Sequence, residues 1–261
     1  MYLPVADVHA SPAVLFLVPF FIALLTTPAG VSGAFLLLPF QVSVLGFVTP
    51  AVTPTNLVFN VASVPGGILR YWRDGITDGR LVLTVVSGTV PGVAIGTAIR
   101  VELLAAPGPF KLFVGTVLLV LSLRLLVTGP ARGEEAEKVE APRPRIVGLA
   151  FVIGIVGGIY GISGGSMLAP SLVAMFGLSV RRVAAAALTS TFVTSLAGVV
   201  AFEVLGVRPD YVLGLLLASG GIAGSYLGAR LQGRFSPELL RRLLGALAIA
   251  LAVSYIAPSL A

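Results

Sequence analysis

Apolar residues fall into successive runs along this chain, separated by short polar or glycine-containing connections. A helix that crosses the apolar part of a bilayer takes ~20 residues, and most of the runs approach that length. The pattern predicts an all-α polytopic membrane protein. The runs cover residues 12–27, 33–48, 54–72, 81–101, 107–128, 146–160, 164–178, 183–205, 210–231 and 237–257.

Composition supports this interpretation. Of 261 residues, 57% are hydrophobic and only 11% are charged, and the mean hydropathy is +1.03. Soluble domains carry about 25% charged residues, so an ordinary soluble fold is excluded. The chain has no cysteine, which excludes disulfides and thiolate metal sites.

The one long polar stretch, residues 129–145, is rich in proline and charge and predicts a linker between two membrane halves, residues 1–128 and 146–261. Most Lys and Arg residues share one side of the predicted topology with this linker, which is the pattern of cytoplasmic loops. We therefore expect a multi-pass protein of the inner (plasma) membrane with both termini outside. The net charge is +6, but the basic residues lie at the ends of apolar runs and do not form a patch. We therefore expect no nucleic-acid partner.

The two halves resemble each other. Gly30-Val31-Ser32-Gly33, followed by Pro39, recurs 131 residues later as Gly161-Ile162-Ser163-Gly164, followed by Pro170. Each half has an odd number of runs, five, so the second enters the membrane upside down. Inverted repeats are a transporter architecture, with the substrate site near the midplane between them. Two glycine ladders, expected to mediate close helix packing, also repeat: Gly88, Gly92, Gly96 and Gly220, Gly224, Gly228.

The first two runs of each half are short, and a Gly/Ser break separates them. Each pair predicts either a hairpin that dips into the membrane or two full crossings, since both leave the loops on the same sides. An unwound break cannot face lipid, so it lines a cavity or packs against protein.

The breaks are candidate anion sites. Ser32 and Ser163 are placed as N-caps, and each following helix start offers backbone N–H groups and partial positive charge. Asn56 and Asn60, one helical turn apart, correspond to Ser190 and Thr194 in the second half and add hydrogen-bond donors. The alternatives are close packing at the breaks and interhelical hydrogen bonding by the polar side chains. The predicted substrate-binding residues are Gly30, Ser32, Gly33, Asn56, Asn60, Tyr160, Gly161, Ser163, Gly164, Gly165, Ser166, Ser190 and Thr194.

The duplicated Gly-x-Ser-Gly…Pro signature, with the polar third and glycine-rich fourth segments, resembles the sulfite exporter TauE/SafE family. That resemblance implies a bacterial or archaeal inner-membrane permease for sulfite, sulfonates or related organic anions. The first copy has Ala34 where the second has Gly165, so the halves need not bind the anion equally.

The hypothesis is therefore a permease for small sulfur-containing oxyanions that works by alternating access, without enzymatic activity, cofactor or metal. The alternatives are a cation carrier or channel, which the lack of a mid-span carboxylate disfavours, and an intramembrane serine protease. The protease needs a base beside its serine, and the single histidine, His9, lies outside every predicted span.

Overall fold

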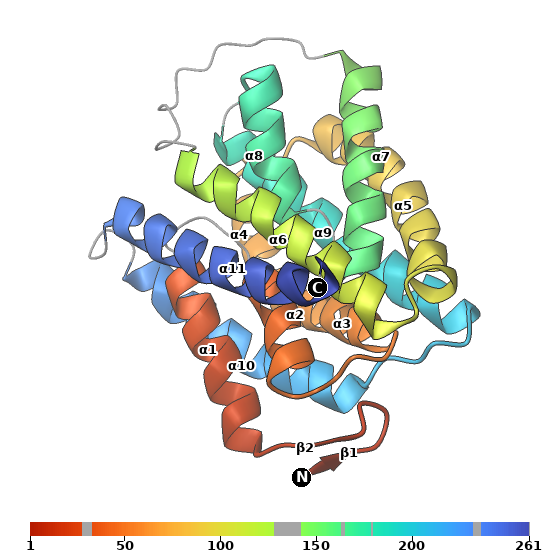
Figure 1. Ribbon diagram of the computed structural model, residues 1–261. Helices are drawn as coiled ribbons and strands as arrows, with labels where there is room; N and C mark the ends of the chain where they lie inside the picture. Colours follow the sequence, from red (N-terminus) through yellow and green to blue (C-terminus); the bar gives the residue numbers. More distant parts are fainter. Residues whose placement is uncertain (28–32, 128–141, 163–164, 179, 232–235, 261) are drawn as a thin grey trace.

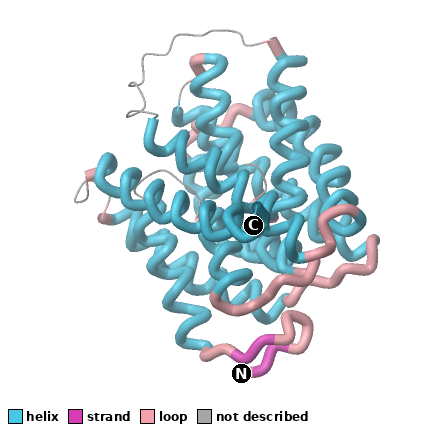
Figure 2. The backbone as a smooth tube through the Cα atoms, viewed as in Figure 1, coloured by secondary structure: helices cyan, strands magenta, loops and turns pink. Residues whose placement is uncertain are grey.

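A computed structural model describes residues 1–27, 33–127, 142–162, 165–178, 180–231 and 236–260, which are almost entirely helical (Figures 1 and 2). Within these residues, five helices (α5, α6, α7, α9 and α10) are long and apolar enough to cross a membrane, which confirms the predicted all-α polytopic class. The helices are α1 (Pro12–Thr26), α2 (Ala34–Ser43), α3 (Val52–Ser63), α4 (Pro65–Arg73), α5 (Gly79–Glu102), α6 (Pro107–Val127), α7 (Arg143–Tyr160), α8 (Gly165–Phe176), α9 (Val180–Val204), α10 (Tyr211–Arg230) and α11 (Pro237–Leu260).

A small antiparallel hairpin of β1 (Tyr2–Leu3) and β2 (Val8–His9) precedes α1. The hydrophobicity pattern did not predict it, because two-residue strands are too short to show an alternation. The backbone N–H of Ala6 in its turn donates to Oδ2 of Asp210 at 3.2 Å, which ties the hairpin to the start of α10. His9 is exposed and stacks against Tyr2.

Short helices lie on both sides of the first predicted break and after the second, whereas α7, which precedes the second, is long enough to cross a membrane, unlike the short run predicted there. At 1.5 Å per residue, α1, α2 and α8 extend ~22, ~15 and ~18 Å, well below the ~30 Å hydrocarbon thickness. Helix α1 ends at Thr26 and α2 begins at Ala34, and α7 ends at Tyr160 and α8 begins at Gly165. These boundaries agree with helix starts near Gly33 and Gly164.

The third apolar run differs from the prediction, because it forms two helices rather than one. Pro65 has no backbone N–H to bond the carbonyl four residues earlier, so α3 ends at Ser63 and α4 begins anew. Two glycines follow Pro65, and Gly67 N–H bonds back to the Val64 carbonyl at 3.0 Å. The polar side chains of α3 are thus on a short helix of their own.

The most extensive helix pairs each join one half of the chain to the other. Helix α5 packs against α7, α1 against α10, and α6 against α11 (Figure 1). In the predicted repeat, α5 is equivalent to α10, α7 to α1 and α6 to α11. The pair α5–α7 is therefore equivalent to the pair α1–α10, and the pair α6–α11 is equivalent to itself. Helix α3, which bears the two asparagines, contacts α2, α7, α9 and α10 and so lies at the centre of the bundle.

The glycine ladders set the register of these pairs. A Cβ atom added at Gly88, Gly92 or Gly96 would lie within 2.4 Å of a carbonyl oxygen of α7, namely that of Val147, Phe151 or Ile155. Both series ascend together, so α5 and α7 run parallel. The other ladder meets α1 in the same manner, with Gly220, Gly224 and Gly228 opposite the carbonyls of Phe16, Phe20 and Leu24. Each partner in α1 lies 131 residues before its equivalent in α7. The structure therefore shows the ladders in close helix contact, as predicted.

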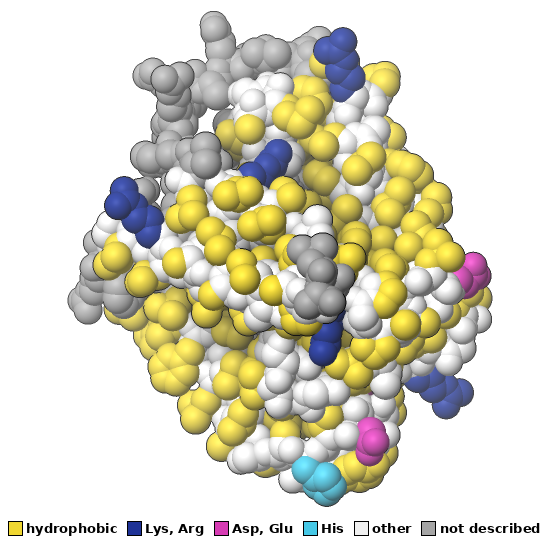
Figure 3. All heavy atoms as spheres, in the orientation of Figure 1, with side chains coloured by type: hydrophobic (Ala, Val, Ile, Leu, Met, Phe, Trp, Pro, Cys, Tyr) yellow, Lys and Arg dark blue, Asp and Glu magenta, His cyan; other side chains and the backbone are white. Residues whose placement is uncertain are grey.

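Several polar side chains are buried inside the protein, and many large apolar side chains are exposed on its outside. Asn56, Asn60 and Arg100 are at most 1% exposed, whereas Leu83 and Val204 are more than 70% exposed. Figure 3 shows one face on which apolar side chains predominate and charged side chains are few. This distribution suits a protein surrounded by lipid, whose interior holds the groups that need hydrogen-bond partners.

Candidate functional site

The second break packs against α3. Gly161 is the C-cap of α7, and its φ of +87° is the left-handed conformation that glycine adopts without strain. A side chain there would also strike α3, since a Cβ would lie 2.8 Å from the Thr53 carbonyl oxygen. The Thr53 hydroxyl donates to the carbonyl of Ile159 at 3.1 Å. Glycine at this position lets the unwound chain lie directly on α3.

Asn56 connects the two breaks. Its Nδ2 donates to the carbonyl of Gly161 at 3.0 Å and to that of Ala34, the first residue of α2, at 3.3 Å. Asn60 Nδ2 donates to the same Gly161 oxygen at 3.2 Å. One buried amide thus holds the start of α2 and the end of α7 together.

Tyr160 makes a second connection between the breaks. Its side chain is fully buried, and its hydroxyl donates to the carbonyl of Phe35 in the first turn of α2 at 2.7 Å. Tyr255 of α11 bonds the same helix further along, through the Pro39 carbonyl at 3.2 Å. Helix α2 is therefore fixed by side chains from three other helices.

Two buried polar atoms beside these contacts have no hydrogen-bond partner among the residues that the structure describes: Gln41 Oε1 and Thr26 Oγ1. Both side chains are fully buried. Gln41 Nε2 donates to Asn56 Oδ1 at 3.1 Å, and Thr26 Oγ1 lies beside Gly33, 3.3 Å from where a Cβ on that glycine would stand. Buried polar atoms are normally paired, so these two mark a place where a ligand can supply the partner.

Arg100, in the last turn of α5, is fully buried and has no carboxylate partner in the described part of the chain. Its guanidinium donates to Thr53 Oγ1 at 3.2 Å, to the Thr49 carbonyl at 3.3 Å and to the Leu104 carbonyl, and it stacks 3.7 Å from the Phe110 ring centroid. The same Thr53 hydroxyl donates to the carbonyl of Ile159 in the last turn of α7, so two hydrogen bonds connect this fixed positive charge to α7.

The remaining predicted residues are not all gathered there. Ser190 and Thr194 of α9 bond to Thr89 Oγ1 of α5, at 3.1 and 2.9 Å, and form a separate hydroxyl cluster. Gly33, and not the predicted Ser32, is the N-cap of α2, so no side-chain hydroxyl caps this helix; Gly165 begins α8, and Ser166 follows in its first turn. Gly30, Ser32, Ser163 and Gly164 lie outside the described residues.

Sequence reasoning missed Thr26, Gln41 and Arg100. Thr26 and Gln41 each stand in or at the end of a strongly apolar run, where a single polar residue is a detectable signal. Arg100 stands near the end of the apolar run predicted over residues 81–101, where an arginine is the detectable signal.

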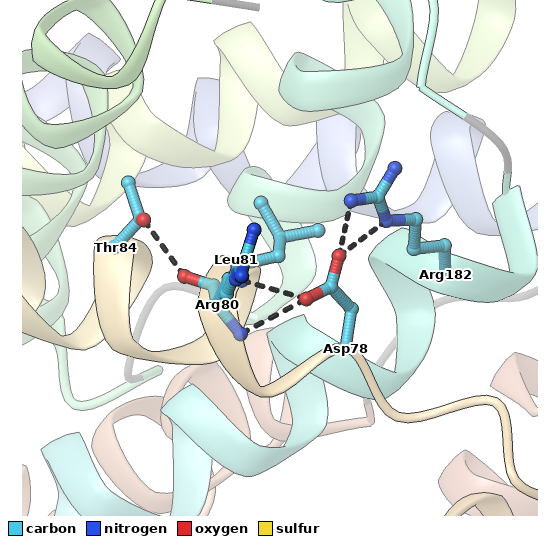
Figure 4. Close-up of polar contacts among 5 residues, drawn as sticks. All are labelled: Asp78, Arg80, Leu81, Thr84 and Arg182. Atoms are coloured by element: carbon cyan, nitrogen blue, oxygen red, sulfur yellow. Dashed lines mark hydrogen bonds and ion pairs between the residues drawn. The ribbon is translucent and has the colours of Figure 1, made fainter. Parts of the chain in front are cut away.

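At the opposite end of α5, an ion pair joins the two halves. Arg182 Nε donates to Asp78 Oδ2 at 2.6 Å, and Asp78 Oδ1 caps α5 by accepting from the backbone N–H groups of Arg80 and Leu81 (Figure 4). Partial burial favours the neutral acid, but the hydrogen bond from Arg182, the two backbone bonds and the nearby positive charge outweigh it. The pKa of Asp78 is therefore below its ordinary value.

Replacing Asp78 by asparagine should make stability less dependent on acid pH. A lowered pKa in the folded state stabilises the fold above the unfolded-state pKa, and this contribution disappears as the pH falls through the folded-state pKa. Asparagine keeps the helix cap and removes only the partly exposed ion pair, so the loss at neutral pH is about 0.5 kcal/mol. Thermal unfolding in detergent from neutral to acid pH measures this, and parallel curves for both proteins would contradict the assignment.

A cavity of about 400 Å³, lined by Arg80, Leu83, Thr84 and Arg143, lies at the starts of α5 and α7. None of the predicted site residues lines it. It is at the other end of α7 from the break, and we assign it no part in the site.

Comparison with known proteins gives a consistent result. The sequence model of the sulfite exporter TauE/SafE family matches residues 15–255. Two relatives from Bacillus subtilis (strain 168) are similar along most of their length. "Probable membrane transporter protein YjnA" is 26% identical over 233 residues, covering 85% of this chain and 90% of the relative. "Probable membrane transporter protein YunE" is 26% identical over 210 residues, covering 74% and 76%. No solved structure matches the chain at a significant level.

Proposed function

This chain belongs to the sulfite exporter TauE/SafE family, and on that premise we propose that the substrate it moves across the membrane is a small sulfur-containing oxyanion, such as sulfite or an organosulfonate. Family membership and the relatives make it a membrane transporter. The oxyanion substrate and alternating access at a central site are the parts that we propose.

The observation that carries the proposal is the pair of hydrogen bonds from Asn56 to Ala34 and Gly161. They bring the start of α2 next to the break that precedes α8. Helix starts carry unsatisfied N–H groups and partial positive charge, which favour anions. Gln41 Oε1 and Thr26 Oγ1, buried and without partners among the described residues, support a ligand at this position.

The charge distribution favours an anion over a cation. Arg100 is a fully buried cation that bonds Thr53, whose hydroxyl also bonds the last turn of α7. Within the described ranges, no group of three or more acidic or histidine residues is arranged to hold a metal ion. A cation at this site would be repelled by the fixed positive charge of Arg100.

The roles of the predicted residues are part of this proposal. Ser32 and Ser163, with the backbone N–H groups near Gly33, Gly164 and Gly165, hold the oxyanion, and Gly30 and Ser166 flank them. Both Nδ2 hydrogens of Asn56 already bond carbonyls, so Asn56 positions the breaks, assisted by Asn60, Tyr160 and Gly161. Ser190 and Thr194 shape the path along α9.

Alternating access rests on an inverted repeat of residues 1–128 and 146–261, joined by a cytoplasmic linker at 129–145. Support comes from the exchanged pairs α5–α7 and α1–α10, whose glycine ladders share one register. Because the two inverted halves make equivalent contacts, they can exchange conformations. The protein then has an outward-open and an inward-open state of similar free energy. The protein acts in the inner membrane with both termini outside.

Flux in proteoliposomes tests this function. We expect the purified protein to release entrapped radiolabelled sulfite, and to leave entrapped sodium inside. Ser163→Leu, which removes the proposed N-cap hydroxyl, should lower the flux at least tenfold while the protein still inserts and elutes as a single species. Sodium release without sulfite release would refute the oxyanion assignment, and normal sulfite flux in the variant would refute the role of Ser163.

A further inference from the structure

We propose that the cavity at the starts of α5 and α7 binds the phosphate of an anionic phospholipid, and that this lipid links a helix of one half to a helix of the other. The inference goes beyond the proposed function, because the cavity lies at the end of α7 opposite the second break. Three features support it: two arginines without partners, an exposed apolar side chain beside them, and the helix packing that sets their spacing.

The two arginines line one cavity from different helices. Arg80 is in the first turn of α5 and Arg143 is the first residue of α7, and the cavity between them measures about 400 Å³. Both side chains are exposed, and neither guanidinium makes a hydrogen bond or ion pair with the residues that the structure describes. Two guanidinium groups at one cavity repel each other, and a phosphate between them removes this repulsion and accepts hydrogen bonds from both.

Asp78, two residues before Arg80, does not supply this negative charge. Its Oδ1 accepts from backbone N–H groups at the start of α5, and its Oδ2 accepts from Arg182 of α9. In the view of Figure 4, Arg182 and the cavity-lining Thr84 lie on opposite sides of Asp78. The ion pair with Arg182 therefore leaves the guanidinium of Arg80 to an external anion.

The position of the cavity favours a lipid over an ion from solution. Helix α5 is long and apolar enough to cross a membrane, so Arg80 in its first turn lies at the level of a membrane surface. Leu83, which also lines the cavity, is 71% exposed and lies three residues further into the helix. Basic side chains at the surface and an apolar side chain below them match a phospholipid, whose acyl chains follow its phosphate. Inorganic phosphate would use the arginines but not Leu83.

The close packing of α5 against α7 sets the spacing of the two arginines. Each ladder glycine of α5 lies opposite the carbonyl of the residue 59 positions later, as Gly88 lies opposite that of Val147. The same offset puts Thr84 level with Arg143, and Arg80 one helical turn, ~6 Å, closer to the membrane surface. Two long side chains that start one turn apart on adjacent helices can bond a single phosphate.

The equivalent positions of the predicted repeat lack both arginines. Helix α10 is equivalent to α5 and α1 to α7, and these positions hold Val212 and Pro12 in place of Arg80 and Arg143. The glycine contacts of the two helix pairs are nevertheless the same. The arginines are therefore not needed for the packing of the helices. The lipid site belongs to one surface of the membrane, the one that is predicted to face the cytoplasm.

The experiment measures lipid affinity of the purified chain in detergent by native mass spectrometry, together with its thermal unfolding. We expect phosphatidylglycerol to bind about tenfold more tightly than phosphatidylcholine at low ionic strength, and to raise the unfolding temperature. Salt should reduce this preference, because it screens exposed charges. Each arginine at a membrane surface contributes about fivefold, so Arg80→Gln and Arg143→Gln should each weaken phosphatidylglycerol binding by about that factor. The double variant should lose the preference and the stabilisation.

Arg145→Gln is the matched control. Arg145 is exposed on the same helix, two residues after Arg143, and does not line the cavity. The substitution removes the same charge from the same surface, and the affinity for phosphatidylglycerol should change little. Inorganic phosphate, added at the concentration of the lipid, should neither raise the unfolding temperature nor displace the lipid. All variants should elute as single species, because the substituted arginines are exposed.

Three results would overturn the inference. Equal effects of Arg145→Gln and Arg143→Gln would mean that the lipid responds only to the total charge of the surface. Equal affinity for phosphatidylglycerol and phosphatidylcholine would remove the selectivity for an anionic head group. Stabilisation by inorganic phosphate equal to that by the lipid would make the ligand a soluble anion. Lipid binding is measured without sulfite, so a failure of sulfite flux would refute only the proposed function.

Discussion

Replacing Asn56 by leucine should abolish sulfite transport. Leucine has a similar size but no amide, so the carbonyls of Ala34 and Gly161 each lose one buried donor and Gln41 Nε2 loses one of its two acceptors. Three buried hydrogen bonds are lost at about 0.5–1.5 kcal/mol each, which predicts a loss of about 3 kcal/mol in the free energy of unfolding. Because the two breaks are no longer held together, flux should fall at least a hundredfold. Proteoliposome flux and thermal unfolding in detergent measure the two effects.

Asn60→Leu is the matched control. Asn60 lies one turn further along the same buried face and makes a single hydrogen bond to the Gly161 carbonyl, 3.2 Å away. Its loss should destabilise by about 1 kcal/mol and reduce flux without abolishing it. If the two variants behaved alike, or if Asn56→Leu transported normally, the bridge between the breaks would not be what assembles the site.

Gly224→Leu should prevent the protein from folding. A Cβ at this position would lie 2.1 Å from the carbonyl oxygen of Phe20 and 2.8 Å from its Cα, and backbone atoms of a packed helix cannot move aside. Overpacking in a well-packed core typically costs 1–3 kcal/mol, and a clash with backbone separates α10 from α1 along its length. Membrane fractions should contain little protein, and what is extracted should aggregate on size-exclusion chromatography.

Gly148→Leu gives the corresponding control in α7. Nothing lies within 4 Å of a Cβ built at Gly148, so leucine there meets lipid or solvent. This variant should be expressed, eluted and transported like the unmodified chain. Comparable expression of both variants would show that the clash is relieved by helix movement and that the ladder does not set the packing.

The sequence predicted those features of the fold that recur in both halves. Gly92 and its equivalent Gly224 stood out because one pattern appeared twice, and the structure places both against a carbonyl of the partner helix. Asn56 was visible because a polar residue is unusual in an apolar run. Pro65 is the signal that separates α3 from α4. The prediction gave one helix because the apolar pattern continues on both sides of this proline.

Other features of the site could not be predicted from the sequence, because they depend on which helices contact one another. Arg100 is buried because Thr49, Thr53 and Phe110, from other segments, surround it. No spacing within α5 reveals those contacts. Likewise, Ser190 and Thr194 were grouped with the asparagines by their repeat position, whereas the geometry pairs them with Thr89. Repeat symmetry predicts which residues of the two halves occupy equivalent positions. It does not predict which side chain each of them bonds, because that side chain belongs to another helix.

The pairing of helices between halves has a consequence for biosynthesis. Helix α5 is made and inserted before α7 exists, so its glycine stripe first faces lipid, and α1 likewise waits for α10 until most of the chain has been translated. Polar α3 cannot gain its contacts with α9 and α10 until then either. The nascent first half is therefore an incomplete assembly intermediate in the bilayer, and a ribosome that stops early leaves a target for membrane quality control.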